Sequence, residues 1–202
     1  NRHEEYQGRR ILHTHESSGN VHGPAPFAVD FARRCVDSGA DAVLMHGSHV
    51  LRGIELHRGK PILYGLGNFV YQANLVERLP ADALEKFDLP EDAGDEAVFA
   101  RFEQLSTKAG TPTVAGRSPH LVGSAYSVLA RLRLARSGPG EIRLHPLTLG
   151  PERSREQCGY PRLATGPVAD EILRLLRDLS APFGTTVVPR DGCGVVALAS
   201  RG

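Results

Sequence analysis

The feature that most constrains the fold is an apolar run, Ala42 to Met45, that stops at two histidines, His46 and His49. Such a short unbroken run is typical of a strand that is buried on both faces inside a parallel sheet. Two small residues between the histidines allow the backbone to turn sharply. Because open α/β sheets collect their chemistry at the carboxyl ends of strands, we expect both imidazoles to point into one cavity there.

A second predicted strand, residues 10–15, also ends in polar side chains: His13, His15 and Glu16. It is followed by a helix over residues 27–36. The apolar side chains of this helix form two neighbouring stripes, Phe27, Phe31 and Cys35 in one and Ala28, Ala32 and Val36 in the other. Strand, helix and strand in this order predict a right-handed βαβ unit, which brings the two histidine-bearing strand ends close together.

The rest of the chain predicts three hairpins and one more helix. Alternating apolar and polar residues give the middle hairpin one solvent-exposed face. The helix has Pro167 in its first turn, where the missing N–H of proline costs nothing. The hairpins are expected at residues 53–64, 126–149 and 185–198, and the helix at residues 167–179.

Residues 73–122 differ from the rest, because prolines interrupt them and acidic side chains cluster within them. We expect this segment to be an insertion that leaves the core. It is either a lid over the site or a solvated excursion with no role.

Composition limits the possible partners and compartments. The chain has 24 basic and 23 acidic side chains, so we expect no nucleic-acid or bilayer-surface partner. Its three cysteines lie far apart, which argues against a disulfide framework and against a cysteine-type zinc site. No apolar run approaches the roughly 18 residues of a membrane span. The chain alone therefore predicts a cytoplasmic location, and an upstream signal or anchor would instead direct it to the cell envelope.

Four of the nine histidines lie at the two predicted strand ends. Neutral imidazole is a common ligand of zinc, manganese and iron, so His13, His15, His46 and His49 are candidate metal ligands. A metal there could polarise a carbonyl or phosphoryl oxygen, and a spare histidine or Glu16 could move the proton. The alternative is four hydrogen-bonded structural histidines. No aspartate at a strand end supplies the carboxylate that such sites usually include.

Two further residues are candidates for substrate binding. Arg52 could bind a carboxylate or a phosphate through two hydrogen bonds, or it could pair with Glu55 or a neighbouring acid. Asn68, in a glycine-rich turn after a predicted strand, could orient a ligand or could cap the turn.

Taken together, several segments resemble the CapA family, the poly-γ-glutamate capsule-biosynthesis-type proteins of the calcineurin-like metallophosphatase superfamily. The segments are His13–Glu16, Ser38–Asp41, His46–Glu55, Gly59–Phe69 and Pro161–Ala164. The resemblance implies an α/β fold, a two-sheet αββα sandwich with the metal site at its strand ends. His46 and His49 would stand for the superfamily's late Gly-His-x-His element, and His13 or His15 for its middle histidine element. Met45 replaces the usual glycine and the spacing is His-x-x-His, so which imidazole binds metal and which acts as a base stays open.

The family's early aspartate and asparagine/glutamate motifs are absent from this chain. The resemblance therefore implies that residues 1–202 are the C-terminal half of such a domain, with the lid at about 73–122. The N-terminal half of the same protein would supply the missing carboxylates. The implied cofactor is a divalent metal ion: Mn, Zn, Fe, Ca or Mg.

The implied activity is metal-dependent acid–base chemistry on a peptide or γ-glutamyl substrate, either epimerisation at an α-carbon or amide hydrolysis. His46, His49 and Glu16 would be catalytic, and Arg52 and Asn68 would bind the substrate. The alternatives are a metallophosphoesterase and a non-catalytic accessory protein of poly-γ-glutamate synthesis or export.

Overall fold

The computed structural model describes most of two sheets and the helices that pack on them. It covers residues 2–6, 9–15, 23–71, 81–86, 88–90, 92–94, 96–97, 100–101, 125–134, 140–150, 153 and 157–198, and for residues 2–15 it describes the strand backbones.

The first sheet has a parallel centre and antiparallel edges. Strand β2 (Arg9–His15), β3 (Ala42–His46) and β5 (Lys60–Leu63) run parallel to one another. The outer strands, β1 (Arg2–Tyr6) beside β2 and β4 (Ile54–His57) beside β5, are antiparallel to their neighbours. The predicted βαβ unit and the hairpin after it are thus confirmed. Strand β1 was not predicted, because its sequence is polar.

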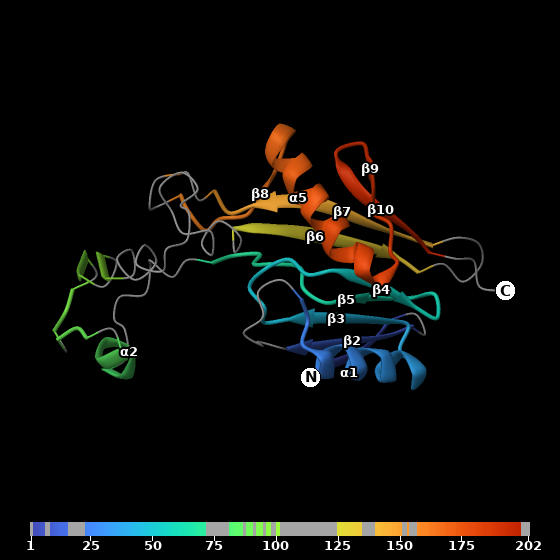
Figure 1. The fold of residues 1–202 in the computed structure, drawn as a ribbon, viewed down its shortest axis with the longest axis horizontal. Coiled ribbons are helices and arrows are strands. Elements are labelled where there is room, and N and C mark those ends of the chain that lie inside the picture. The colour runs from blue at the N-terminus through green and yellow to red at the C-terminus, as the bar shows by residue number, and fades with distance from the viewer. Residues whose placement is uncertain are drawn as a thin grey trace.

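Helix α1 (Pro26–Asp37) covers one face of this sheet (Figure 1). It begins at a proline, which the first turn of a helix tolerates. The stripe that packs on the sheet is Ala28, Ala32 and Val36, whereas Phe27 is 65% exposed. Small side chains let the helix approach the sheet closely. The helix packs on side chains of β3 and β5 and of the residue that follows β5: Val43, Met45, Ile62 and Tyr64.

The second sheet is antiparallel throughout. Its order is β6 (Tyr126–Arg133), β7 (Gly140–Thr148), β10 (Cys193–Leu198) and β9 (Val188–Arg190), and the short β8 (Arg162–Leu163) also pairs with β7. Both predicted hairpins in this region are confirmed. Alternation gives the sheet two unlike faces: Ile142 and Leu144 are fully buried, while Arg131 and Arg133 of β6 are exposed.

The two sheets share one apolar core with α5 (Gly166–Ser180), which crosses the second sheet and reaches β4 (Figure 1). A short 3₁₀ helix, η2 (Ala181–Phe183), extends it. The core takes Leu51, Ile54 and Leu63 from the first sheet and its loops, Val128, Ile142, Leu144, Val196 and Leu198 from the second, and Ala169, Ile172 and Leu176 from α5. The fold is therefore mixed α/β with two sheets. Among the described residues, no helix is both long and apolar enough to cross a membrane.

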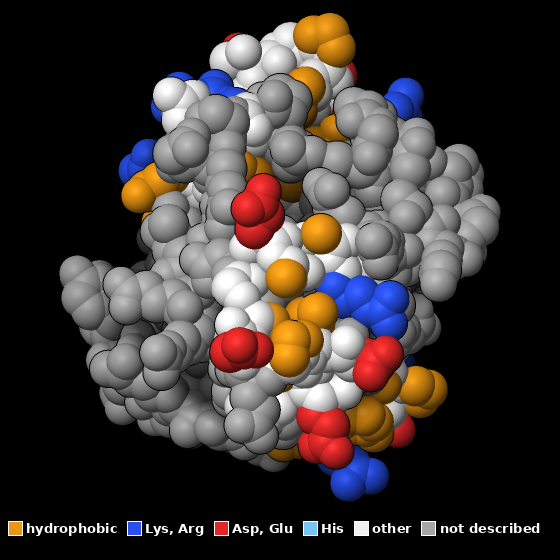
Figure 2. Space-filling model, turned by 90° about the vertical axis from the view of Figure 1, so that its left-hand side faces the viewer, with side chains coloured by type: hydrophobic (Ala, Val, Ile, Leu, Met, Phe, Trp, Pro, Cys, Tyr) orange, Lys and Arg blue, Asp and Glu red, His pale blue; other side chains and the backbone are white. Residues whose placement is uncertain are grey.

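Only part of the predicted insertion is described, including α2 (Ala81–Lys86). Its described residues lie beyond the end of both sheets (Figure 1). On that end of the molecule, acidic side chains surround apolar ones (Figure 2), and Glu85, Asp88, Asp92 and Glu96 are exposed. Residues 73–80 and 102–122 lie outside the described part of the chain, so the lid stays a prediction.

Candidate functional site

The carboxyl ends of β2 and β3 lie side by side. Their parallel register pairs the Cα of His13 with that of Leu44, and the Cα of His15 with that of His46. Since neighbouring strands are about 4.8 Å apart, the predicted adjacency of the two histidine-bearing ends is confirmed for the backbone. The side chains of His13 and His15, and the whole of Glu16, lie outside the described residues. Their part in the site stays a prediction.

After β3 the backbone turns through two left-handed residues. His46 ends the strand and is exposed, Gly47 has φ = 94°, and His49 has φ = 57°. Glycine adopts this conformation freely, but in a residue with a Cβ it costs about 1–2 kcal/mol. Ser48 Oγ donates a hydrogen bond of 2.9 Å to the carbonyl of Val50, which closes the turn. Strain of this kind persists only where surrounding contacts hold it, and it gathers at functional sites.

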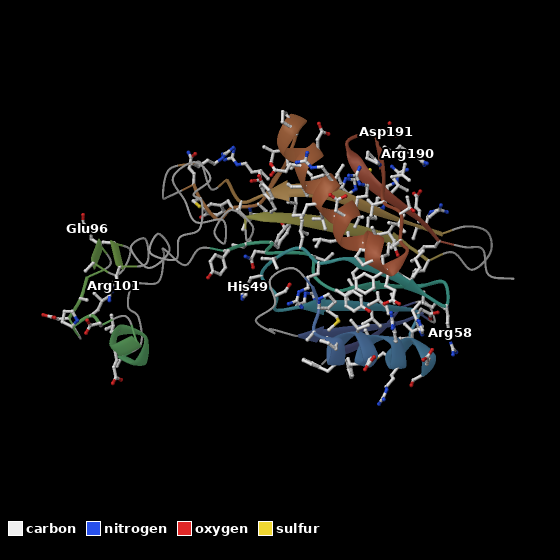
Figure 3. All side chains as sticks on the ribbon, in the orientation of Figure 1. His49, Arg58, Glu96, Arg101, Arg190 and Asp191 are labelled. Carbon is white, nitrogen blue, oxygen red and sulfur yellow. The ribbon has the colours of Figure 1, made fainter. Side chains whose placement is uncertain are left out.

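Two contacts hold the His49 ring. Its Nδ1 lies 2.8 Å from the Oδ1 of Asn68, and the ring packs edge-on against Tyr71 with centroids 5.6 Å apart. Because an amide oxygen can only accept, Nδ1–H is the donor in this hydrogen bond, and Nε2 is the lone-pair nitrogen whenever the ring is neutral. Figure 3 shows His49 at the edge where the parallel strands end. A histidine fixed through one nitrogen is arranged to act through the other, as a base or as a metal ligand.

The histidine loop, residues 46–52, is hydrogen-bonded to the turn that follows β5. The Arg52 amide donates to the Gly65 carbonyl at 3.0 Å, and the Tyr64 amide donates to the Gly53 carbonyl at 3.2 Å. A Cβ on Gly65 would lie 2.6 Å from Ser48 Oγ and 3.0 Å from the carbonyl oxygen of Val50, so a larger residue there would displace the Ser48 side chain. These contacts explain why Asn68, carried by the second turn, reaches a histidine carried by the first.

Arg52 lies beside this loop and is only 1% exposed. Its predicted alternative partner, Glu55, has both carboxylate oxygens engaged elsewhere. Arg33 Nε donates to one at 2.9 Å and the Tyr64 hydroxyl donates to the other at 2.6 Å. Contact between Arg52 and a substrate stays a prediction, as does contact between Asn68 and a substrate.

The Glu55 cluster, which consists of Arg33, Glu55 and Tyr64, links α1 to β4 and to the residue that follows β5. Burial raises the pKa of Tyr64 far above its ordinary value, and the hydrogen bond to Glu55 adds to the rise. The Tyr64 ring also packs on Phe183 of η2, with centroids 5.0 Å apart. Sequence reasoning missed both this cluster and Tyr71, because no local pattern distinguishes them from ordinary core and loop residues.

The described residues do not by themselves complete a metal site. No group of three or more His, Cys, Asp or Glu side chains among them could hold an ion. His46 and His49 are two nitrogen donors at one edge of the sheet, and the arrangement of His49 suits a ligand. A full ligand set requires further donors, such as the histidines of β2.

The fold and the site thus define a mixed α/β protein with histidines where its parallel strands end. Residues 5–73 match the family described as bacterial capsule synthesis protein PGA_cap, and this range contains every candidate site residue. This part of the chain is thus similar to a CapA-like family.

Three relatives show the extent of the likeness. The uncharacterized protein y4sH of Sinorhizobium fredii is 37% identical over 92% of this chain, which spans only 40% of that protein. The probable polyglutamine synthesis accessory protein Rv0574c of Mycobacterium tuberculosis is 48% identical over 60 residues, 30% of this chain and 16% of that protein. The capsule biosynthesis protein CapA of Bacillus anthracis is 34% identical over 61 residues, 30% of this chain and 15% of that protein.

Proposed function

We propose that the protein is a metal-dependent acid–base enzyme that acts on a peptide or γ-glutamyl substrate. One observation carries the proposal: the register that sets the histidine-bearing ends of β2 and β3 side by side, with His49 held at the same edge by Asn68. Adjacent imidazoles at a carboxyl edge are suited to binding a cation and moving protons.

In this proposal His49 is the base. Its Nδ1–H donates to Asn68, so Nε2 takes a proton from water or from an α-carbon, and the amide oxygen stabilises the imidazolium that results. His46 and the histidines of β2 would bind a divalent ion, which polarises a carbonyl and activates water when bound. A spare histidine or Glu16 would move the second proton.

We infer further that the two sheets are the C-terminal part of a metallophosphatase-type αββα sandwich, and that the N-terminal half of the protein supplies the carboxylate ligands. The parallel centre of the first sheet, covered on one face by α1, supports this inference. The Sinorhizobium fredii relative also supports it, because this chain spans only 40% of that protein.

The experiment is an incubation of the full-length protein with peptide and γ-glutamyl substrates in D₂O. Deuterium at an α-carbon without cleavage identifies an epimerase, and new amine and carboxyl ends identify a hydrolase. Phosphate released from a phosphoester would identify the metallophosphoesterase alternative.

His46→Ala and His49→Ala are expected to abolish turnover. His57→Ala is the matched control, because His57 lies at the opposite edge of the first sheet, where its Nε2 is 3.0 Å from Asp37 Oδ1. Full turnover in both site variants would refute the enzyme proposal.

The second candidate is a non-catalytic accessory role in making a polyglutamate-type polymer. The Mycobacterium tuberculosis relative, which is named an accessory protein of polyglutamine synthesis, favours it. Polymer production in cells separates the two candidates, because an accessory protein that only docks would support full production with both site histidines replaced.

A further inference from the structure

Exposed apolar side chains gather next to His49, and the proposed chemistry uses only one of them, through the contact between His49 and Tyr71. Ten large apolar side chains are exposed in the described part of the chain, and four of these lie within two short segments. Single exposed apolar residues are ordinary, whereas several together indicate a binding surface. We call this surface the apolar rim; it consists of Phe69, Val70, Tyr71 and Tyr160.

Backbone hydrogen bonds hold the two segments of the apolar rim together. The Tyr71 amide donates to the Gly159 carbonyl at 3.1 Å, and the Gly159 amide donates to the Leu149 carbonyl at 2.8 Å. Because Leu149 directly follows β7, these bonds fix the rim to the second sheet. The bond from His49 to Asn68, the residue before the rim, fixes it to the histidine loop as well. Loop residues that a rigid scaffold holds in this way are typical binding residues.

The apolar rim is continuous with the proposed active site. The rings of Tyr71 and His49 have centroids 5.6 Å apart, and both side chains are exposed. Figure 3 shows His49 at the end of the sheet where the proposed reaction takes place. A molecule that reaches the His49 ring is therefore within one side chain's length of the rim.

We propose that the apolar rim is a subsite for a bulky apolar side chain, and that the substrate is a peptide with such a side chain next to its reacting carbonyl. This inference rests on the proposed function for the place where the substrate reacts. An apolar side chain that leaves water to pack on the rim is stabilised by burial, and aromatic rings offer it a large contact area. A carboxylate side chain would instead lose hydration against four residues that carry no opposite charge.

The test is fluorescence anisotropy of two labelled octapeptides of alanine and glycine, titrated with the full-length protein. The peptides differ only in one central residue, which is leucine in one and serine in the other. The parent is expected to bind the leucine peptide at least about tenfold more tightly, because burial of a leucine side chain contributes that much or more. Phe69→Ser with Tyr160→Ser should weaken binding of the leucine peptide about tenfold, to the level of the serine peptide. Tyr71 is kept, because its replacement would also release the His49 ring.

The matched control is Val188→Ser, which should preserve the preference for leucine. It removes an exposed apolar side chain from β9, the outermost strand of the second sheet, away from the carboxyl ends of β2 and β3 (Figure 1). Circular dichroism establishes that each variant folds. Equal binding of the two peptides by the parent, or an unchanged preference in the folded double variant, would overturn the proposal. So would a parent that sediments as a dimer and a double variant that sediments as a monomer, because the rim would then bind a second copy of the chain.

Turnover separates this inference from the proposed function. If the parent converts both peptides at the same rate, the enzyme proposal stands and the subsite is refuted. If the parent prefers the leucine peptide in binding but converts no peptide or γ-glutamyl substrate, the subsite stands and the enzyme proposal is refuted.

Discussion

A methyl group at Gly53 would collide with the end of α5. An ideal Cβ there would lie 2.2 Å from the carbonyl oxygen of Leu179 and 3.0 Å from the Cδ2 of Phe183. The first obstacle is backbone, which cannot rotate away as a side chain can. The same helix end is anchored to β4, because the amide of Ile54 donates to Ser180 Oγ at 3.0 Å. Gly53→Ala therefore forces α5 and the start of β4 apart.

The size of the effect follows from the overlap. Real Cβ atoms essentially never approach a heavy atom within 3.0 Å, so a contact of 2.2 Å requires a shift of at least about 0.8 Å. Overpacking of this kind costs about 1–3 kcal/mol, and a backbone obstacle places Gly53→Ala near the upper end. The lower entropy of the unfolded alanine chain returns about 0.4–1 kcal/mol. We expect a net loss of about 2 kcal/mol in the free energy of unfolding.

The assay is urea unfolding followed by circular dichroism, with Gly94→Ala as the matched control. A Cβ on Gly94 meets nothing within 4 Å, and no positive φ opposes it, so this variant should be as stable as the parent or slightly more stable. Because Gly53 follows the histidine loop, Gly53→Ala should also lower turnover. If the two alanine variants unfold at the same urea concentration, the packing described for α5 against the loop is wrong.

Three further predictions concern single hydrogen bonds near the site. Asn68→Ala removes the acceptor from His49 Nδ1 and should reduce metal affinity or turnover about 10- to 100-fold without unfolding the protein; unchanged affinity and turnover would contradict the role given to Asn68. Because the pKa of Tyr64 is raised in the folded state, its contribution to stability is complete below about pH 10 and is lost as the pH rises further, where only the unfolded chain ionises. In urea titrations at a series of pH values, the free energy of unfolding of Tyr64→Phe should be about 1–2 kcal/mol lower than that of the parent at neutral pH. It should also fall less steeply than that of the parent as the pH rises into the alkaline range. Parallel falls in the two proteins would exclude this explanation. Ser180→Ala leaves the first amide of β4 without its buried acceptor and should cost about 1–3 kcal/mol of unfolding free energy, a loss that an unchanged urea midpoint would disprove.

The order of elements could be predicted because it depends on local signals. The apolar run before His46, the helical spacing after Pro26 and the turn at Arg58 and Gly59 each act over a few residues. Because consecutive strands of a sheet are usually neighbours, β2 was then expected beside β3, as the structure has it. The packing face of α1 could not be chosen in this way. Its two apolar stripes are neighbours on the helix, and only the sheet beneath selected the one with small side chains.

The sequence indicated candidate site residues and could not indicate the contacts among them. The sequence indicated His46, His49 and Asn68, but the bond between His49 and Asn68 depends on two turns meeting through a glycine at position 65. The partner of Glu55 was likewise decided by geometry. Ile54 faces the shared core, so alternation along β4 turns Glu55 toward α1, where Arg33 meets it.

The most direct test of the central claim is a double-mutant cycle on metal affinity, measured by calorimetry with Mn²⁺ and Zn²⁺ in the full-length protein. If the ends of β2 and β3 share one ion, His15→Ala and His46→Ala should each weaken binding at least about tenfold. Their effects should be non-additive by about 0.5–3 kcal/mol, while His57→Ala leaves the affinity unchanged. Strictly additive effects, or full affinity in the double variant, would show that the two strand ends do not share a metal site.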